Sequence, residues 1–457
     1  MANKDVTDPA RMEKIVSLCK RRGFIFQAGE LYGGLNGCWD YGPLGAELKR
    51  NLKDYWWRKT VQERDDVLGM DGAILTMEQV LQSSGHIGGF SDPMVDCKTC
   101  KGRFRADNLE TSQCKEKPSV CPGASPKCEL TEPRQFNLML QTNFGATGEQ
   151  IAYLRPETAQ SIFVQYKNVL DSNRIKLPFG IAQVGKSFRN EINPRNFTFR
   201  SREFEQMEIE YFCHPDDGMR LTDEWLEARL SFYEEIGIPR EKLHILDVPD
   251  GERAFYSKKT YDIEYEFPFG IQELEGVAYR TDYDLGVHQK GAGKPLEYFD
   301  EETKQRFLPH VVEPSAGCDR TVLALICEAF DEETLTDEKG KEDIRTVLRF
   351  KPTMAPIKVG IFPMLKKNEE QVRIAKEIQK SLQKWMPVFY DDGGAIGRRY
   401  RRQDEVGTPY CVTVDFDTLG ENGEDLKGTV TIRHRDSMEQ ERIQIDALLP
   451  WLLERVR

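Results

Sequence analysis

Residues 202–212 constrain the fold of this chain more than any other segment. Their side chains alternate between polar and apolar. The apolar positions are Met207, Ile209 and Tyr211, and the polar ones are Gln206, Glu208 and Glu210. This period of two predicts a β-strand that buries one face in a core. Carboxylates on the other face are typical of the solvated side of an antiparallel sheet, and also of the polar floor of a binding site. The alternation alone favours the solvated side.

A second strand, predicted over residues 179–191, shifts that balance toward a site. Ala182, Val184 and Phe188 share one of its faces, and Gln183, Gly185, Ser187 and Arg189 share the other. The loop that follows adds Arg195, Arg200 and Arg202. Guanidinium groups bind phosphate oxygens bidentately, so arginines beside carboxylates suit a polyphosphate and a cationic substrate in one pocket. The alternative is a set of surface ion pairs, each worth about 0–1 kcal/mol.

A third segment, residues 313–320, leads into residues 317–330, which predict a turn followed by a buried helix. Gly317 allows the backbone to approach a ligand closely. Arg320 falls in the first helical turn, where the helix dipole favours an acid. A cation at this position indicates an external anion nearby.

The other periodic segments predict helices around an antiparallel sheet. The first helix is expected to begin after Asp8 with Pro9 in its first turn, and to end at Gly23. Further helices are expected over about 46–63, 157–170 and 216–236, and further strands over 260–267 and 271–282.

The domain organisation follows from this order of elements. Residues 1–350 would form the larger domain, interrupted by a cysteine-rich insertion at about 91–133. Charged residues and prolines predict a boundary at about 337–356. Residues 355–457 then alternate strands and helices, which predicts a small α/β domain.

The overall charge excludes one class of function. The chain has 64 basic and 76 acidic residues, a net charge of −12, which argues against non-specific nucleic-acid binding through a globally basic surface. A local basic groove is compatible with this charge. No apolar run is long enough to span a membrane and no secretory signal is evident, so a cytoplasmic location is expected.

Several spaced motifs resemble those of a known family. Arg189–Glu191 followed by Phe204–Glu208 resembles the second signature motif of class II aminoacyl-tRNA synthetases, and Gly317–Arg320 resembles the third. The motifs that narrow the resemblance to the dimeric glycyl-tRNA synthetases are Tyr41–Gly45, Arg155–Gln160 and Glu313–Ser315, and the similarity also includes Arg402–Tyr410 in the tail. The resemblance runs from about residue 11 to the end of the chain.

The resemblance implies an α+β fold, in which an antiparallel-sheet catalytic domain is followed by a C-terminal α/β anticodon-binding domain. It implies a glycine–tRNA ligase, which uses ATP and Mg²⁺ to form glycyl-adenylate and pyrophosphate and then transfers glycine to the 3′ end of tRNA(Gly). It also implies a homodimer, whose interface would include the helix from about residue 46 and the strand through Met70 to Leu75. Trp56 and Trp57 on that helix suit an interface and core packing equally.

The resemblance also implies roles for individual residues. The residues implied to bind ATP are Arg189, Asn190, Glu191, Phe199, Arg200, Phe204, Glu273, Leu274, Arg280, Gly317 and Arg320. The residues implied to bind glycine are Arg105, Glu157, Phe204, Glu208, Glu313 and Ser315. Arg189, Arg320 and Glu208 would be catalytic, and Mg²⁺ would lie near Glu273. Because Glu273 and Arg280 have opposite strand parity, both can face the site only if a bulge occurs near Gly276.

Selection of glycine has a physical explanation on this hypothesis. Glycine has no side chain to recognise, so the site must exclude larger amino acids. Carboxylates around the ammonium would attract it and fill the space where a Cβ would lie. An editing domain is therefore not required.

The insertion carries a candidate zinc site. Its cysteines are Cys97, Cys100, Cys114, Cys121 and Cys128. Cys97 and Cys100 form a CxxC pair, which is half of a tetrahedral zinc site. Related synthetases often carry a second pair just before a segment like residues 129–134, which favours Cys121 and Cys128 as the remaining ligands and leaves Cys114 spare. The alternative is a loop with unused thiols or a decayed site.

Two further questions stay open at the level of sequence. The basic cluster Arg398–Arg402 suits contact with the anticodon stem or loop, or equally a solvated helix face balanced by Asp404 and Glu405. The rival families are class II synthetases for proline or threonine, and a non-catalytic paralogue such as the polymerase accessory subunit. Such a paralogue loses the ATP-binding arginines, whereas this chain keeps Arg189, Arg200 and Arg320.

Overall fold

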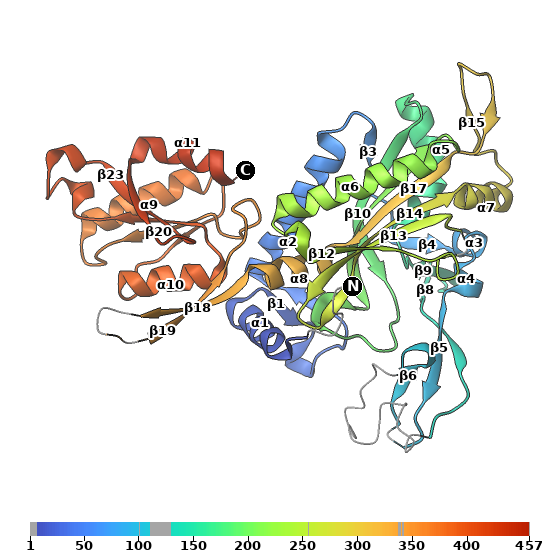
Figure 1. Ribbon diagram of the computed structural model, residues 1–457, viewed down its shortest axis with the longest axis horizontal. Helices are drawn as coiled ribbons and strands as arrows, with labels where there is room; N and C mark the ends of the chain where they lie inside the picture. The colour runs from blue at the N-terminus through green and yellow to red at the C-terminus, as the bar shows by residue number, and fades with distance from the viewer. Residues whose placement is uncertain are drawn as a thin grey trace.

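The computed structural model describes residues 7–99, 101–109, 129–254, 256–336, 340 and 342–456. Figure 1 shows a larger N-terminal domain built on a twisted sheet and a separate C-terminal domain beside it. A hairpin-like arm that holds β5 and β6 projects from the larger domain. Among the described residues, none of the helices combines the length and the apolar character needed to cross a bilayer.

A seven-stranded sheet forms the centre of the larger domain, in the order β12-β13-β14-β17-β11-β10-β3. Its strands are β3 (Val67–Gly69), β10 (Phe179–Phe188), β11 (Glu203–Cys213), β12 (Leu243–Asp247), β13 (Lys259–Phe267), β14 (Gly270–Thr281) and β17 (His310–Gly317). Neighbouring strands are antiparallel except β3, which runs parallel to β10. The predicted strands over 179–191, 202–212, 260–267 and 271–282 are confirmed with small shifts at their ends.

One face of this sheet packs against helices and forms the main core. The helices in this layer and beside it are α1 (Pro9–Arg22), α2 (Pro43–Trp57), α6 (Gly218–Ile236) and α8 (Cys318–Ala329). Met207, Ile209 and Tyr211 are buried in this core, as their alternation predicts. Helix α2 also contributes Trp56, which is 1% exposed, so core packing accounts for this tryptophan.

The opposite face of the sheet is divided into an apolar end and a polar end. Helices α5 (Ala159–Asn173) and α7 (Tyr283–Ala292) cover the apolar end. The sheet side chains buried beneath them are Phe179, Ile181, Phe212 and Val311. Toward the other end of β11 and β17, the same face of the sheet carries Glu208 and Ser315, which lie opposite each other on the paired strands. The polar end is therefore left uncovered by these helices and can form a pocket.

Local sequence signals explain where several helices begin and end. The Asp8 side chain accepts a hydrogen bond from the backbone N–H of Arg11, Pro9 is the first residue of α1, and Gly23 ends it in the left-handed conformation, as predicted. Helix α2 begins at Pro43, three residues before the predicted start, because proline suits the first helical turn. It continues into a π-helical segment, Arg58–Gln62.

Two small three-stranded sheets flank the central sheet. One has the order β4-β9-β8, with β4 (Leu75–Met77), β8 (Leu140–Phe144) and β9 (Gln150–Leu154). The other has the order β6-β5-β7, in which β5 (Ser91–Asp96) and β6 (Arg103–Arg105) lie in the predicted insertion and β7 (Arg134–Asn137) directly follows it. The short elements that remain are β1 (Ile25–Gln27), β2 (Trp39–Tyr41), α3 (Glu78–Ser83), α4 (His86–Gly89), β15 (Tyr298–Phe299) and β16 (Arg306–Phe307).

The C-terminal domain is a five-stranded sheet with helices, in the order β21-β20-β22-β23-β24. Its elements are β20 (Val359–Pro363), α9 (Glu369–Leu382), β21 (Val388–Tyr390), α10 (Ile396–Val406), β22 (Tyr410–Val414), β23 (Thr429–His434), β24 (Gln440–Gln444) and α11 (Ile445–Val456). An antiparallel hairpin connects the domains, with β18 (Phe330–Thr336) and β19 (Glu342–Leu348). The domain boundary at about 337–356 stays a prediction, and residues 342–348 within it form β19, which pairs with β18.

Candidate active site

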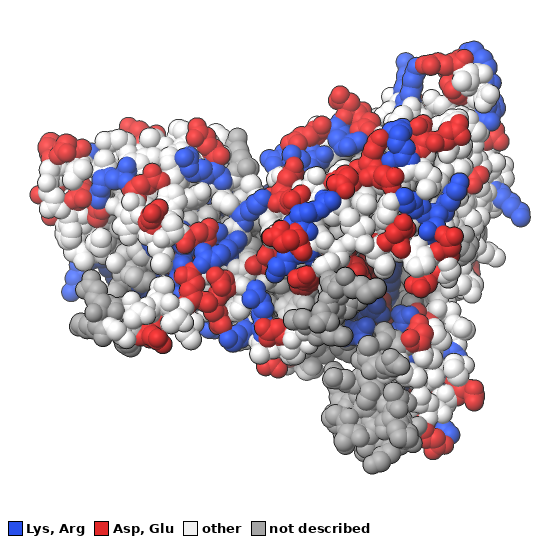
Figure 2. All heavy atoms as spheres, viewed as in Figure 1, with Lys and Arg blue, Asp and Glu red and all other residues white. Residues whose placement is uncertain are grey.

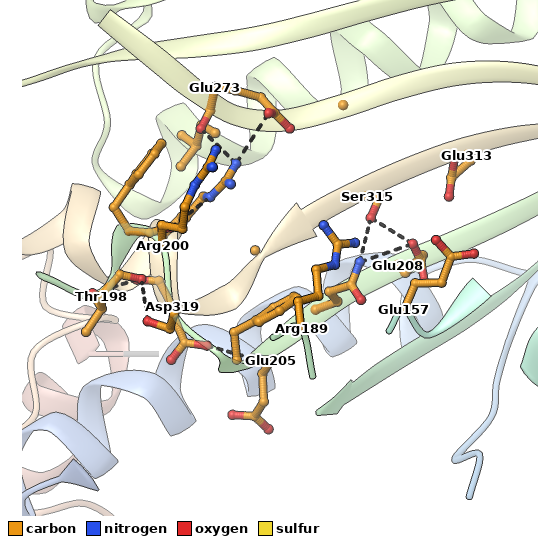
Figure 3. Close-up of a pocket in the computed structure, with 18 of the residues that line it drawn as sticks. Glu157, Arg189, Thr198, Arg200, Glu205, Glu208, Glu273, Glu313, Ser315 and Asp319 are labelled. Atoms are coloured by element: carbon orange, nitrogen blue, oxygen red, sulfur yellow. Dashed lines mark hydrogen bonds and ion pairs between the residues drawn. The ribbon is translucent and has the colours of Figure 1, made fainter. Parts of the chain in front are cut away.

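The polar end of the central sheet forms the floor of a cavity of about 260 Å³. Figure 3 shows its side chains converging from β11, β14, β17, α8 and the loops beside them. Arg189, Arg320 and Glu208, which are distant in sequence, line this one cavity. The other predicted site residues that line it are Glu157, Glu191, Phe199, Arg200, Phe204, Glu273, Leu274, Arg280, Glu313, Ser315 and Gly317. Burial of Glu208 in this floor excludes the solvated-face alternative.

A β-bulge allows β14 to contribute both Glu273 and Arg280 to the cavity. Ile263 pairs with Glu275 and Glu264 pairs with Glu273, so Leu274 is the extra residue. The inserted residue shifts the alternation by one, and Gly276, Ala278 and Arg280 then face the cavity with Glu273. The bulge required by the opposite parity of these residues is present at Leu274, near Gly276 as predicted.

Arg320 lies at one end of the cavity, at the start of α8. Its guanidinium carbon is 4.5 Å from the centre of the Phe199 ring, and its Nε donates to the Phe199 carbonyl over 3.2 Å. Its Nη1 lies 3.4 Å from the Glu273 carboxylate. A Cβ on Gly317 would lie 3.3 Å from Arg320 Cγ, so the glycine leaves room for this side chain. The guanidinium group of Arg320 is thus held by backbone and ring contacts, while the carboxylate of Glu273 is half-exposed.

Arg189 and Phe204 lie between the two ends of the cavity, as Figure 3 shows for Arg189. The guanidinium carbon of Arg189 is 5.3 Å from the centre of the Phe204 ring, and its Nε donates to the Pro156 carbonyl over 3.0 Å. Arg200 approaches Glu191 with 3.8 Å between Nη1 and the carboxylate. Cations and aromatic faces therefore border the middle of the cavity, which suits a nucleotide and its phosphates.

Carboxyl groups gather at the opposite end. Ser315 Oγ donates to Glu208 Oε1 over 2.8 Å, and the Thr158 hydroxyl donates to the other Glu208 oxygen. Burial, then the charge of Glu157, raises the pKa of Glu208. The hydroxyl donors oppose this rise and fix the carboxyl group in place.

A buried ion-pair network supports the same end. Arg280 Nη1 donates to both oxygens of Glu313 over 3.0 and 2.9 Å, while its Nε and Nη2 donate to Asp284 on α7 over 2.8 and 2.9 Å. Burial raises the pKa of Glu313 to about 8, against the opposing charge of Arg280. Arg280 therefore fixes the acids of this end and is occupied by them, whereas the resemblance assigns it to the triphosphate.

Glu157 is the most acidic member of this group. Its carboxylate lies 3.4 Å from His86 Nε2 and accepts from Gln160 Nε2 over 2.9 Å. Burial alone raises the pKa of Glu157, but His86 and Arg280 outweigh it and hold the pKa well below the usual range. Glu157 also raises the pKa of His86, against the effect of burial. His86 therefore helps to keep a cavity carboxylate ionised.

Sequence reasoning missed an anchor formed by Asp319, which lines the cavity. Asp319 Oδ1 accepts from the Tyr41 hydroxyl over 2.5 Å and from Lys49 Nζ over 2.8 Å, and its Oδ2 accepts from the backbone N–H of Glu205 over 2.6 Å. This anchor joins α8 to β11 and α2, and so fixes Arg320 relative to Phe204. It also places an acid in the first turn of α8, so the dipole of α8 is already complemented beside Arg320.

The other missed lining residues have weaker signals in the sequence. They are Thr198, Ser201, Glu205, Gln206, Tyr256, Gly276 and Ala278. Gln206 was predicted on the polar face of its strand, without a role in the site. Tyr256 lies outside every quoted motif, and only the fold places its ring 4.1 Å from the Arg280 guanidinium carbon.

Two predicted residues do not line the cavity. Arg105 forms ion pairs with Asp92 and Asp107, over 2.8 and 2.7 Å. Asn190 uses its backbone N–H to donate to the Leu138 carbonyl over 2.7 Å, which ties the strand end to the chain before β8. The substrate-binding roles of Arg105 and Asn190 therefore stay predictions.

The zinc prediction falls largely outside the described residues. Cys100, Cys114, Cys121 and Cys128 are not described, whereas Cys97 is buried just after β5. Its carbonyl accepts from the Lys101 N–H over 2.8 Å, and its N–H donates to the Gly102 carbonyl over 2.8 Å. A tight turn therefore begins at Cys97, as a CxxC half-site needs.

One arginine of the basic cluster on α10 serves the fold, whereas Arg398 is exposed, so contact of this cluster with the anticodon region stays a prediction. Arg399 is 2% exposed and donates to the carbonyls of Asp392 and Gly394. Asp404 is fully buried and pairs with Arg345 and Arg433, so it balances no solvated face.

Figure 2 shows acidic and basic side chains interspersed over the visible face, in keeping with the acidic composition.

Comparison with known proteins follows the same division of the chain. The family model described as "tRNA synthetase class II core domain (G, H, P, S and T)" matches residues 144–329, and that described as "Anticodon binding domain" matches residues 358–455. A protein named "Glycine--tRNA ligase" from Treponema denticola is 51% identical over 435 residues, which cover 94% of each chain. Its namesake from Thermobifida fusca is 49% identical over 459 residues, 97% of this chain and 98% of the relative. The chain belongs to the glycine--tRNA ligase family.

Membership of the glycine--tRNA ligase family confirms the resemblance drawn from the spaced motifs. The two domain matches confirm the predicted fold class, a class II catalytic core followed by a C-terminal anticodon-binding domain. A third relative with this name, from Clostridium perfringens, is 49% identical and covers 95% of the chain. This agreement over nearly the whole length favours the glycine--tRNA ligase family over the synthetases for proline or threonine.

Proposed function

We propose that this chain is a glycine–tRNA ligase whose larger domain, residues 1–350, activates glycine and whose residues 355–457 bind the anticodon region of tRNA(Gly). One observation carries the proposal: a single cavity holds arginines and aromatic rings at one end and carboxyl groups at the other. The first end suits the phosphates and base of ATP. The second suits the ammonium group of a small amino acid.

The proposed adenylation places the reacting groups beside Arg189. An oxygen of the glycine carboxylate attacks the α-phosphorus of ATP, and the bond from that phosphorus to the pyrophosphate oxygen breaks. Arg189 would bridge the glycine carboxylate and the α-phosphate, while Arg200 and Arg320 would hold the outer phosphates. Positioning and charge neutralisation then supply most of the catalysis. A ribose hydroxyl at the tRNA 3′ end next attacks the glycyl carbonyl carbon, and AMP leaves.

The carboxyl end would select glycine by attraction and by crowding. Glu157, Glu208 and Glu313 would surround the ammonium, with Ser315 holding Glu208 in place. Tyr256 and Arg280 close the same end of the cavity. A larger amino acid would require space that these groups occupy, and steric exclusion of larger substrates is efficient.

Magnesium binding fits the residues at the arginine end. Mg²⁺ keeps several waters and takes one or two carboxylates together with substrate phosphates. Glu273 is half-exposed at the cavity, and burial together with the charges of Glu273 and Glu264 raises the pKa of the nearby Asp262 to about 7. This local excess of negative charge suits a cation. Glu273 would hold Mg²⁺, which would neutralise phosphate charge when bound.

Two further proposals concern assembly and the insertion. A homodimer is supported by exposed apolar side chains on the β4-β9-β8 sheet, namely Leu75, Met77, Phe144 and Ile151. Analytical ultracentrifugation tests the dimer. A structural Zn²⁺ held by Cys97, Cys100, Cys121 and Cys128 is supported by the CxxC spacing and by the buried turn at Cys97. Metal analysis of the purified chain tests the zinc.

The decisive experiment for the proposed function is ATP–pyrophosphate exchange with a panel of amino acids. We expect exchange with glycine and much weaker exchange with alanine, serine, proline and threonine. Charging of tRNA(Gly) in the same preparation tests the second step. Exchange that is driven best by another amino acid would contradict the proposal.

A further inference from the structure

Glu210 is a buried acid that the proposed reaction does not use. It lies on β11 two residues beyond Glu208, and its relative exposure is 0%. Neither of its carboxyl oxygens has a hydrogen-bond partner among the described residues. A buried polar group without a partner is costly, so its retention beside the carboxyl end of the cavity needs a reason.

The surroundings of Glu210 are crowded with acids. Oxygens of Glu208, Glu210 and Glu313 all lie within 4.8 Å of one another. The charged groups that act on Glu210 are Glu313 on β17, Arg280 on β14, Glu208 on its own strand and Asp284 on α7. Arg280 is the only cation of this group, and Glu313 and Asp284 already accept its hydrogen bonds. Carboxyl groups this close cannot all be ionised, so the group must hold a proton.

The contacts indicate which acid holds this proton most firmly. Glu313 has two hydrogen bonds from Arg280, and Glu208 has hydrogen bonds from Ser315 and Thr158. These donors favour the ionised form of both acids. Glu210 has no such donor, so its charged form is the least stabilised of the three. Burial, followed by the charge of Glu313, raises the pKa of Glu210 well above its usual range.

We propose that Glu210 is a neutral carboxylic acid that positions Glu208 and Glu313 for the substrate ammonium, its hydroxyl donating a hydrogen bond to one of these two carboxylates. This inference rests on the proposed function, because it assigns the two carboxylates to glycine. A protonated acid adds a donor to the floor of the site without adding a further negative charge. Glu210 is thus a positioning residue and does not line the cavity itself.

Two substitutions separate this role from simple filling of space. Glu210→Gln keeps a neutral side chain that can donate, whereas Glu210→Met keeps the approximate volume and removes the donor. In glycine-dependent pyrophosphate exchange, we expect Glu210→Gln to leave the KM for glycine nearly unchanged. Glu210→Met should raise the KM for glycine about tenfold, as expected for a lost hydrogen bond to a charged group. The KM for ATP should stay the same in both variants, which a general packing defect would not produce.

An infrared measurement tests the proton directly. A protonated carboxyl group absorbs at a carbonyl frequency distinct from that of a carboxylate. At about pH 9, where Glu313 is ionised, the difference spectrum between the parent protein and Glu210→Gln should contain a protonated-carboxyl band. A carboxylate band instead, or a KM for glycine in Glu210→Gln as high as in Glu210→Met, would overturn the proposal. A metal ion that binds the parent protein stoichiometrically and is lost in Glu210→Gln would also overturn it.

The design distinguishes failure of this inference from failure of the proposed function. If the parent protein shows no glycine-dependent exchange, the proposed function fails, while the infrared band still reports the state of Glu210. If Glu210→Met does not fold, its thermal transition loses cooperativity. The infrared band and the KM of Glu210→Gln for glycine then still decide whether Glu210 is a neutral positioning residue.

Discussion

The arginines of the cavity and those of the C-terminal domain have opposite surroundings. Arg189 and Arg320 lie over aromatic rings, contact backbone carbonyls and line the cavity. Arg345 and Arg433 are buried, and both donate to Asp404, which is fully buried. The first pair is available to a ligand, and the second pair is used by the fold. The partners of an arginine, more than its presence in a basic cluster, indicate its role.

The same contrast applies to stability. A buried ion pair contributes little net stability, but removal of one partner leaves a buried charge uncompensated. An arginine that faces a cavity loses only weak contacts when it is truncated. Substitutions in the two regions should therefore separate folding from catalysis.

The largest expected effect is on folding and comes from Asp404→Asn. This substitution removes the carboxylate charge that Arg345 and Arg433 share, although Arg345 keeps its ion pair with Glu333, and should lower the free energy of unfolding of the C-terminal domain by about 3 kcal/mol. Thermal and urea denaturation measure it. Glycine-dependent exchange at room temperature should be preserved. The control is Asp425→Asn, at an exposed position. Equal melting temperatures of the two variants would contradict the structural role of Asp404.

The second expected effect is on catalysis and comes from Arg320→Ala. Loss of this cation should reduce kcat/KM for pyrophosphate exchange by about 100-fold, as for removal of one group that stabilises transition-state charge. The melting temperature should change little, because the side chain lies at the cavity. Arg306→Ala, at an exposed residue of β16, serves as the control. Normal exchange by Arg320→Ala would show that the arginine end is not used.

Glu208→Gln should produce a smaller effect, confined to glycine. The amide cannot provide the same attraction for an ammonium group, so the KM for glycine should rise about tenfold. The KM for ATP should be unchanged, because Glu208 lies at the carboxyl end of the cavity. An increase in the KM for ATP alone would reverse the assignment of the two ends.

The smallest expected effect is a dependence on pH through Glu313. Burial raises its pKa to about 8, whereas an unfolded glutamate titrates near 4.3. Between these values the folded state binds more protons than the unfolded state, so the free energy of unfolding falls as pH rises. Ionisation of Glu313 also favours ammonium binding, and the KM for glycine should fall severalfold from about pH 7 to pH 8. Glu313→Gln should flatten both profiles, and an unchanged profile would contradict this origin.

Much of the fold could be predicted because local signals agreed with each other. Asp8, Pro9 and Gly23 determine the ends of α1, and the alternation around Glu208 identifies the two faces of β11. The residue at which the bulge lies could not be predicted, because pairing with Ile263 and Glu264 decides it. The strand over 342–348 was missed because its composition is charged, and its pairing with β18 depends on the fold.

The candidate site was predictable where motifs carried it and less so elsewhere. Fourteen predicted residues line one cavity, but none of the motifs includes Tyr256, and only the fold brings it there. The role of the cluster Arg398–Arg402 was only partly predictable, because the sequence does not show which of its arginines have buried partners. Arg399 contacts backbone carbonyls that are close only in the folded domain.

The comparison between the two sets of arginines is tested most directly by Arg189→Ala and Arg433→Ala, measured side by side. Each variant would be assayed by glycine-dependent ATP–pyrophosphate exchange and by thermal denaturation. We predict that Arg189→Ala abolishes most exchange with little change in melting, and that Arg433→Ala lowers the melting temperature while exchange per folded molecule is retained. Exchange unaffected by Arg189→Ala, in a protein that still folds, would contradict the account.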